Sequence, residues 1–254
     1  FGDLGIRNMK DPTIFGHPDR LGSSLLLDVT SFVDNGGVHV NSGIGNKLCY
    51  LLTDGGTFNG QTITGMGISM TSDLFFASQF LLSPGSDYND LYLALGASAI
   101  DQGLTFEERL NIANAGKAVE IVPAFLIEDG LRDFRALATT NTTGSPVIAL
   151  KWTNPDASLF DEVVVLRSVA GFPTNFGDGE EIARGTQSQH LDEDVIDGVT
   201  YYYSVIVDLT SGLPQLVSAR ATAGEVASSA LTESFGSDSL IATGVNTVDL
   251  AYSQ

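Results

Sequence analysis

The sequence contains a single cysteine, Cys49, and no apolar run that approaches the roughly 18 residues needed to cross a bilayer. Internal disulfides and a membrane-spanning segment are therefore excluded. Cys49 lies in a stretch typical of a helix, where a small buried side chain is a more common role than a reactive thiol. The chain begins at Phe1 with neither an initiator methionine nor a leader pattern, so we expect targeting information to have been removed or left out.

Basic residues are also scarce. The sequence has 12 Lys and Arg against 31 Asp and Glu, which gives a formal net charge of -19. Because this charge repels phosphate groups, we expect nucleic acids and anionic membrane surfaces to be poor partners. The hydrophobic share of 43% is nevertheless high enough for a folded core. A chain of 254 residues has room for one large domain or two modest ones.

The spacing of apolar residues changes along the chain and predicts a multidomain α plus β protein. Up to about Val122 these residues recur at helical spacing, and after about Phe134 they alternate in short runs between turn residues. Asp87 is an expected N-cap, and Thr105 with Glu108 forms a capping box. The expected helices are 42–52, one capped by Ser69 or Thr71, one from Tyr88, and one from Thr105 to about Val119.

The second half predicts an all-β sandwich. Ile148, Leu150 and Trp152 share one face of a strand, which places the only Trp in the core. The further expected strands are 162–168, 181–184, 201–208 and 215–222. We therefore expect a helical domain over 1–122, a linker at 123–133, a sandwich over 134–223, and a tail or the start of a further β domain at 224–254.

The densest group of polar residues and glycines runs from Asp34 to Ile44. Asp34 precedes His39 by five residues, with Gly36 and Gly37 between them. In one interpretation, the carboxylate binds one ring nitrogen and the other nitrogen donates a hydrogen bond to a developing negative charge. In the other, this is a glycine-rich turn whose histidine binds nearby carbonyls. The spacing alone favours the second interpretation.

These residues also carry a family resemblance. The sequence reads IRNMKDP at 6–12, DNGGVH at 34–39, NSGI at 41–44 and NK at 46–47. This pattern closely resembles the thermolysin family of zinc metallopeptidases, over about residues 5–122. The resemblance implies the mainly helical C-terminal lobe of such an enzyme.

The resemblance also implies roles for particular residues. His39 matches the histidine that hydrogen-bonds the tetrahedral intermediate, and Asp34 matches the carboxylate that orients it. Arg7 matches the arginine that binds a substrate carbonyl, and Asn35 falls among the substrate-binding residues. For Arg7 the alternative is a structural ion pair with Asp11 or Asp34.

The family's zinc-binding motif, His-Glu-x-x-His, is missing. None of the three histidines is followed by Glu, so we expect no metal ligands in this chain. The simplest explanation is a fragment of a secreted zinc metalloendopeptidase that acts on peptide or protein substrates. It would lack the N-terminal lobe that holds zinc, and would be inactive alone. The alternative is an extracellular adhesion or assembly subunit built from a derelict peptidase lobe and a β-sandwich.

The sequence LKW at 150–152, with DGVTYYYSV at 197–205, resembles a fibronectin type III domain of the immunoglobulin-like class. Tyr201 is the expected tyrosine corner. Such modules serve as spacers or adhesion surfaces, and the tail from Gly224 would allow self-assembly by strand addition. The acidic residues of 192–197 suggest either a calcium site or a solvated turn, and the lack of EF-hand spacing favours the turn. We expect His190 in an exposed polar loop.

Overall fold

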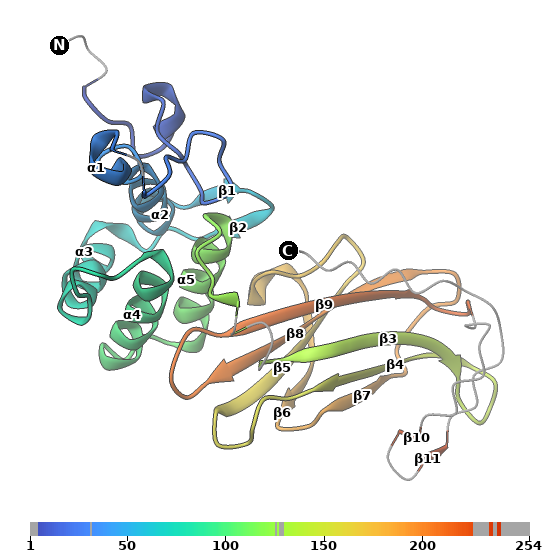
Figure 1. Ribbon diagram of the computed structural model, residues 1–254. Coiled ribbons are helices and arrows are strands. Elements are labelled where there is room, and N and C mark those ends of the chain that lie inside the picture. Colours follow the sequence, from blue (N-terminus) through green and yellow to red (C-terminus); the bar gives the residue numbers. More distant parts are fainter. Residues whose placement is uncertain are drawn as a thin grey trace. The chain divides into compact units, whose positions relative to one another are not determined.

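The computed structural model describes residues 5–30, 32–124, 126 and 130–225, together with the backbone of 234–235 and 238–239. It divides into two compact units, one up to Ala124 with Ser211–Leu213, and one from Phe125 onward. Helices make up most of the first unit and two sheets make up most of the second (Figure 1). The expected tail lies outside the described residues, apart from Gly224, Glu225 and two short paired strands.

In the first unit, helix α2 contacts α3 and α5, and α4 contacts the same two helices. Their apolar faces form one core, which includes Leu48 of α2, Leu74 of α3, Leu95 of α4 and Ile112 of α5. A hairpin of β1 and β2 follows α2. The elements of this unit are η1 (Pro12–Phe15), α1 (Asp34–Gly37), α2 (Gly43–Asp54), β1 (Gly56–Phe58), β2 (Gln61–Ile63), α3 (Gly67–Ser78), η2 (Gln79–Leu81), α4 (Tyr88–Asp101) and α5 (Phe106–Ala118).

Capping explains where two of these helices begin. Asp87 and Thr105 each form a complete capping box at the start of α4 and α5, which confirms both predicted caps. The predicted cap of α3 is wrong, because that helix already begins at Gly67, after Met66, with no side-chain cap. Thr71 lies inside α3 and is buried.

The second unit is a sandwich of two antiparallel sheets. One has the strand order β3-β4-β7 and the other has the order β6-β5-β8-β9 (Figure 1). The strands are β3 (Arg132–Thr140), β4 (Pro146–Thr153), β5 (Phe160–Ser168), β6 (Glu180–Gly185), β7 (Gln189–Asp192), β8 (Thr200–Leu209) and β9 (Gln215–Thr222); η3 is Phe176–Asp178, and the short pair is β10 (Ser234–Phe235) with β11 (Asp238–Ser239).

Two predicted features of the sandwich core are confirmed. Trp152 is buried, and its ring meets Phe134 edge to face at 6.1 Å. The hydroxyl of Tyr201 accepts the main-chain N–H of Ile196 at 3.1 Å, which is the tyrosine corner. With three strands facing four, this arrangement is an immunoglobulin-like sandwich of the fibronectin type III kind.

The structure corrects the prediction for His190. This residue lies in β7, is half-buried and pairs with Leu150 of β4, so it is not in an exposed loop. Strand β7 has only four residues and a polar composition, and it forms because an edge of β4 is open for pairing. Burial lowers the pKa of the His190 imidazole.

Acidic residues at the end of β7 and just after it bind an arginine. The Nη1 of Arg167 donates to Asp192 Oδ1 at 2.9 Å, and its Nη2 lies 3.5 Å from Asp194 Oδ2. The hydroxyl of Tyr203 donates to Asp192 Oδ2 at 2.8 Å, and burial raises the pKa of that phenol. Arg167 and Asp192 thus form a buried ion pair.

Candidate functional site

The segment α1 that carries Asp34 is a left-handed turn. The φ angles from Asp34 to Gly37 are 50°, 51°, 81° and 80°. Left-handed backbone costs ordinary L-residues about 1–2 kcal/mol each, and Gly, Asn and Asp tolerate it best. A side chain at Gly36 would also place its Cβ 2.7 Å from the carbonyl oxygen of Val29. The sequence Asp-Asn-Gly-Gly therefore suits this turn at each position.

The turn brings the Asp34 carboxylate to His39. Asp34 Oδ1 lies 2.7 Å from His39 Nδ1, and Oδ2 accepts the main-chain N–H groups of His39 at 2.8 Å and Val40 at 2.9 Å. The hydrogen bond to the His39 side chain, followed by that to the Val40 N–H, lowers the pKa of the Asp34 carboxyl. Asp34 is therefore ionised near neutral pH. Because a carboxylate can only accept, Nδ1 of His39 must carry a proton in order to donate to Asp34.

The rest of the His39 ring faces solvent. The side chain is 76% exposed, compared with 20% for Asp34. Because Asp34 binds Nδ1, the other nitrogen, Nε2, points away from the carboxylate. In the imidazolium form Nε2 carries a proton and donates, so the pair can stabilise an anion that approaches from outside.

Arg7 is held beside the same histidine. Its Nη1 donates to the carbonyl oxygen of His39 at 3.0 Å and to Ser42 Oγ at 2.6 Å. The Ser42 hydroxyl donates to the same carbonyl oxygen at 2.6 Å. Neither Asp11 nor Asp34, the two alternative partners, is bound by Arg7 in the described part of the chain. A guanidinium has five donors, so Arg7 can hold the His39 backbone with Nη1 and offer its other N–H groups to a substrate carbonyl.

The structure thus brings Arg7, Asp34 and His39 together. Asn35 lies on the left-handed turn with its side chain exposed, and it makes no hydrogen bond to the residues that the structure describes. Its position beside Asp34 leaves the amide available to solvent or to a ligand.

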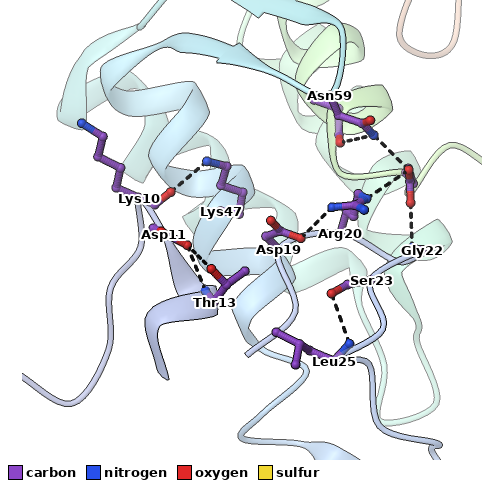
Figure 2. Close-up of polar contacts among 12 residues, drawn as sticks. Lys10, Asp11, Thr13, Asp19, Arg20, Gly22, Ser23, Leu25, Lys47 and Asn59 are labelled. Carbon is purple, nitrogen blue, oxygen red and sulfur yellow. Dashed lines mark hydrogen bonds and ion pairs between the residues drawn. The ribbon is translucent and has the colours of Figure 1, made fainter. Parts of the chain in front are cut away.

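The segment before the site, which contains Gly22 and Leu27, is held by the side chains of Asn41 and Glu120. Asn41 accepts the Leu27 N–H with Oδ1 at 2.9 Å and donates to the Leu27 carbonyl with Nδ2 at 2.9 Å. Glu120 Oε2 accepts the N–H of Gly22 at 2.6 Å. Asn59 donates to Glu120 Oε1 at 2.9 Å (Figure 2). These contacts join residues that are far apart in the sequence, and the sequence analysis missed them.

Lys47 also supports the segment that carries Arg7, a role that was not predicted from the sequence. Its Nζ donates to the carbonyl oxygen of Lys10 at 2.8 Å, three residues after Arg7 (Figure 2). Nζ also lies 4.2 Å from the centroid of the Phe58 ring, a cation–π distance. Burial lowers the pKa of the Lys47 ammonium. The sequence feature that could have revealed this role is a lysine placed among the apolar residues of the helix predicted at 42–52.

No zinc site is formed by the described residues. They contain no group of three or more His, Cys, Asp or Glu side chains placed to hold a metal ion. In the sequence, none of His17, His39 and His190 is followed by Glu.

Cys49 lies in α2 and is half-buried. Burial raises the pKa of its thiol, which makes the thiol a poor nucleophile.

Among the helices of the described residues, none has the length and apolarity that spanning a membrane requires.

Comparisons with known proteins match the two units separately. A zinc metalloproteinase of Renibacterium salmoninarum is 44% identical over 126 residues, which cover 46% of this chain and 23% of that protein. A thermolysin of Alicyclobacillus acidocaldarius is 37% identical over 118 residues, 46% of this chain and 21% of that protein. The chain thus spans less than a quarter of the length of these relatives. A human fibronectin type III domain is 18% identical, with a TM-score of 0.28, over 37% of this chain and 72% of that domain.

The family model for the thermolysin metallopeptidase alpha-helical domain matches residues 2–121. This range contains all of α1 to α5 and the Arg7, Asp34 and His39 cluster. Residues 2–121 of this chain therefore match the alpha-helical domain of thermolysin metallopeptidases.

Proposed function

We propose that this chain is part of a secreted zinc metalloendopeptidase, in which it binds the substrate and stabilises the oxyanion. The observation that carries the proposal is the exposed His39 ring, whose Nδ1 is bound by an ionised Asp34 and whose Nε2 is directed away from it. Zinc, its ligands and the general base would belong to polypeptide outside these 254 residues.

The chemistry assigned to this chain is electrostatic. When water adds to a peptide carbonyl, the C–O bond forms and negative charge develops on the former carbonyl oxygen. The Nε2–H of His39 would donate to that oxygen, and Asp34 would stabilise the positive ring. The general base would take a proton from the water and pass it to the amide nitrogen, so that the C–N bond breaks, the C=O double bond re-forms and a neutral amine leaves. A fixed donor of this kind contributes about 10²–10³-fold in rate.

Arg7 would act on the ground state as well as on the transition state. Its Nη1 contact to the His39 carbonyl holds the guanidinium against the backbone that carries the imidazole. A substrate carbonyl bound by Arg7 would therefore be held at a set position from His39. Asn35, exposed on the neighbouring turn, would supply a further amide to the substrate backbone.

His39→Ala in the parent peptidase tests the assignment. Turnover of a peptide substrate should fall about 10²–10³-fold, since one oxyanion donor is lost. His190→Ala is the matched control, because it removes a histidine from the sandwich unit and should leave turnover unchanged. Near-normal hydrolysis by His39→Ala would refute the proposal. A coding sequence without a His-Glu-x-x-His motif upstream would instead support the adhesion or assembly alternative.

A further inference from the structure

Tyr88 links helix α4 to the segment that carries His39, although 47 residues separate Tyr88 from Asn41. Its hydroxyl donates to the carbonyl oxygen of Asn41 at 2.8 Å and accepts the main-chain N–H of Gly45 at 3.3 Å. Asn41 lies two residues after His39. Gly45 lies in the first turn of α2, so the phenol spans the junction between the His39 segment and this helix.

This contact replaces a missing helix cap. The first N–H groups of a helix lack acceptors within it, and an N-cap side chain usually binds the N2 or N3 group. Ser42 is the N-cap of α2, but its side chain makes no cap hydrogen bond. Instead its hydroxyl donates to the His39 carbonyl and accepts from Arg7. Tyr88 caps Gly45 in its place, which leaves Ser42 available to the site.

The phenol is itself held firmly. Tyr88 is the first residue of α4, and the preceding Asp87 accepts the N–H groups of Asn89 and Asp90 in a capping box. Burial raises the pKa of the Tyr88 phenol, so the hydroxyl stays protonated and can donate to Asn41 near neutral pH. Whereas Tyr88 binds the main-chain carbonyl of Asn41, the Leu27 backbone binds its side-chain amide. The backbone just after His39 is thus fixed from two directions.

We propose that Tyr88 is a positioning residue for His39: its hydroxyl fixes the backbone from Asn41 to Gly45, and thereby the place from which the imidazole donates to the oxyanion. The inference rests on the function proposed above for His39. Tyr88 touches neither substrate nor the reacting atoms, and acts only through the His39 segment.

Tyr88→Phe in the parent peptidase is the test, because it keeps the ring and removes both hydrogen bonds. We expect kcat to fall about tenfold with KM within about twofold, since a 1 Å misplacement of a catalytic group can cost ~10²-fold. Tyr92→Phe is the matched control. Tyr92 is a buried tyrosine of the same helix, and its hydroxyl makes no hydrogen bond within the residues described. It should leave kcat unchanged.

A double-mutant cycle separates positioning from general stability. In a His39→Ala background, Tyr88→Phe should have no further effect on kcat, because the group that it positions is gone. An equal loss in both backgrounds, or no loss with His39 present, would overturn the role of Tyr88 and leave the proposed function intact. Full turnover by His39→Ala alone would overturn both.

Discussion

The Asp34 carboxylate binds His39 at two points. Oδ1 lies 2.7 Å from Nδ1 of the ring, and Oδ2 accepts the main-chain N–H of the same residue at 2.8 Å. One side chain therefore fixes both the ring orientation and the backbone on which the ring stands. The left-handed turn makes this possible, because it reverses the chain within the four residues from Asp34 to Gly37.

This double contact predicts a pH dependence. Hydrogen bonds from His39 and Val40 lower the pKa of Asp34 below its ordinary value of 3.8. A carboxyl whose pKa is lower in the folded state adds stability above its unfolded pKa of about 3.9, and this stability is lost as pH falls through the folded pKa. The turn should therefore persist at pH values at which free carboxyls are already protonated. NMR titration of the Asp34 carboxyl carbon measures this directly.

The control for the titration is Asp34→Asn, which cannot ionise. In that variant the amide signals of His39 and Val40 should no longer shift at acid pH. A midpoint for Asp34 at or above 3.9 would mean that the carboxylate is not held as described.

The left-handed turn predicts that Gly36→Ala is more harmful than Gly60→Ala. Both glycines have left-handed backbone, with φ of 81° and 76°, so each substitution costs about 1–2 kcal/mol of stability. Only at Gly36 does the new Cβ meet another atom, the carbonyl oxygen of Val29 at 2.7 Å; at Gly60 the space is open. We expect a loss of about 1 kcal/mol for Gly60→Ala and at least twice that for Gly36→Ala.

Urea unfolding followed by far-UV circular dichroism compares the two variants in the 254-residue chain. Equal losses of unfolding free energy would show that Val29 moves away at no cost. In that case the close approach of residue 29 to the turn would not be a fixed part of the site.

In the sandwich, the two aspartates that bind Arg167 should differ sharply in their effect on stability. The side chain of Asp192 is 4% exposed and that of Asp194 is 98% exposed. Asp192→Ala leaves a buried guanidinium without its buried partner and should cost about 3–5 kcal/mol. Asp194→Ala should cost less than about 0.5 kcal/mol, because an exposed pair is screened by water.

Trp152 fluorescence reports on this experiment, because the only Trp of the sequence lies in the sandwich core. A small effect of Asp192→Ala would indicate that Glu180, which also binds Arg167, is enough to hold the guanidinium. A large effect of Asp194→Ala would contradict the assignment of the buried pair.

The sequence predicted those features that depend on neighbouring residues. The capping boxes of Asp87 and Thr105 are local signals, and Trp152 follows from alternation along one strand. The hydrogen bond between Asp34 and His39 was part of one of two open interpretations, and the structure shows this bond at 2.7 Å, across the turn that Asp34 begins.

The missed features depend on contacts between distant parts of the chain. Strand β7 is short and polar, and only pairing with β4 makes it a strand. Tyr88 and Lys47 support the site from helices, through main-chain carbonyls that have no sequence signature. Arg7 shows the same limit, because the sequence suggested Asp11 or Asp34 as an ion-pair partner, whereas its hydrogen bonds go to Ser42 and to the His39 carbonyl.

The most direct test is a crystal structure of the parent peptidase with a phosphorus-containing peptide analogue of the tetrahedral intermediate. We expect His39 Nε2 to lie about 2.7–3.1 Å from the analogue's anionic oxygen, with Nδ1 still bound by Asp34. We also expect Arg7 to contact a carbonyl of the analogue while it holds the His39 backbone. An imidazole turned away from that oxygen, with another donor in its place, would show that His39 does not stabilise the oxyanion.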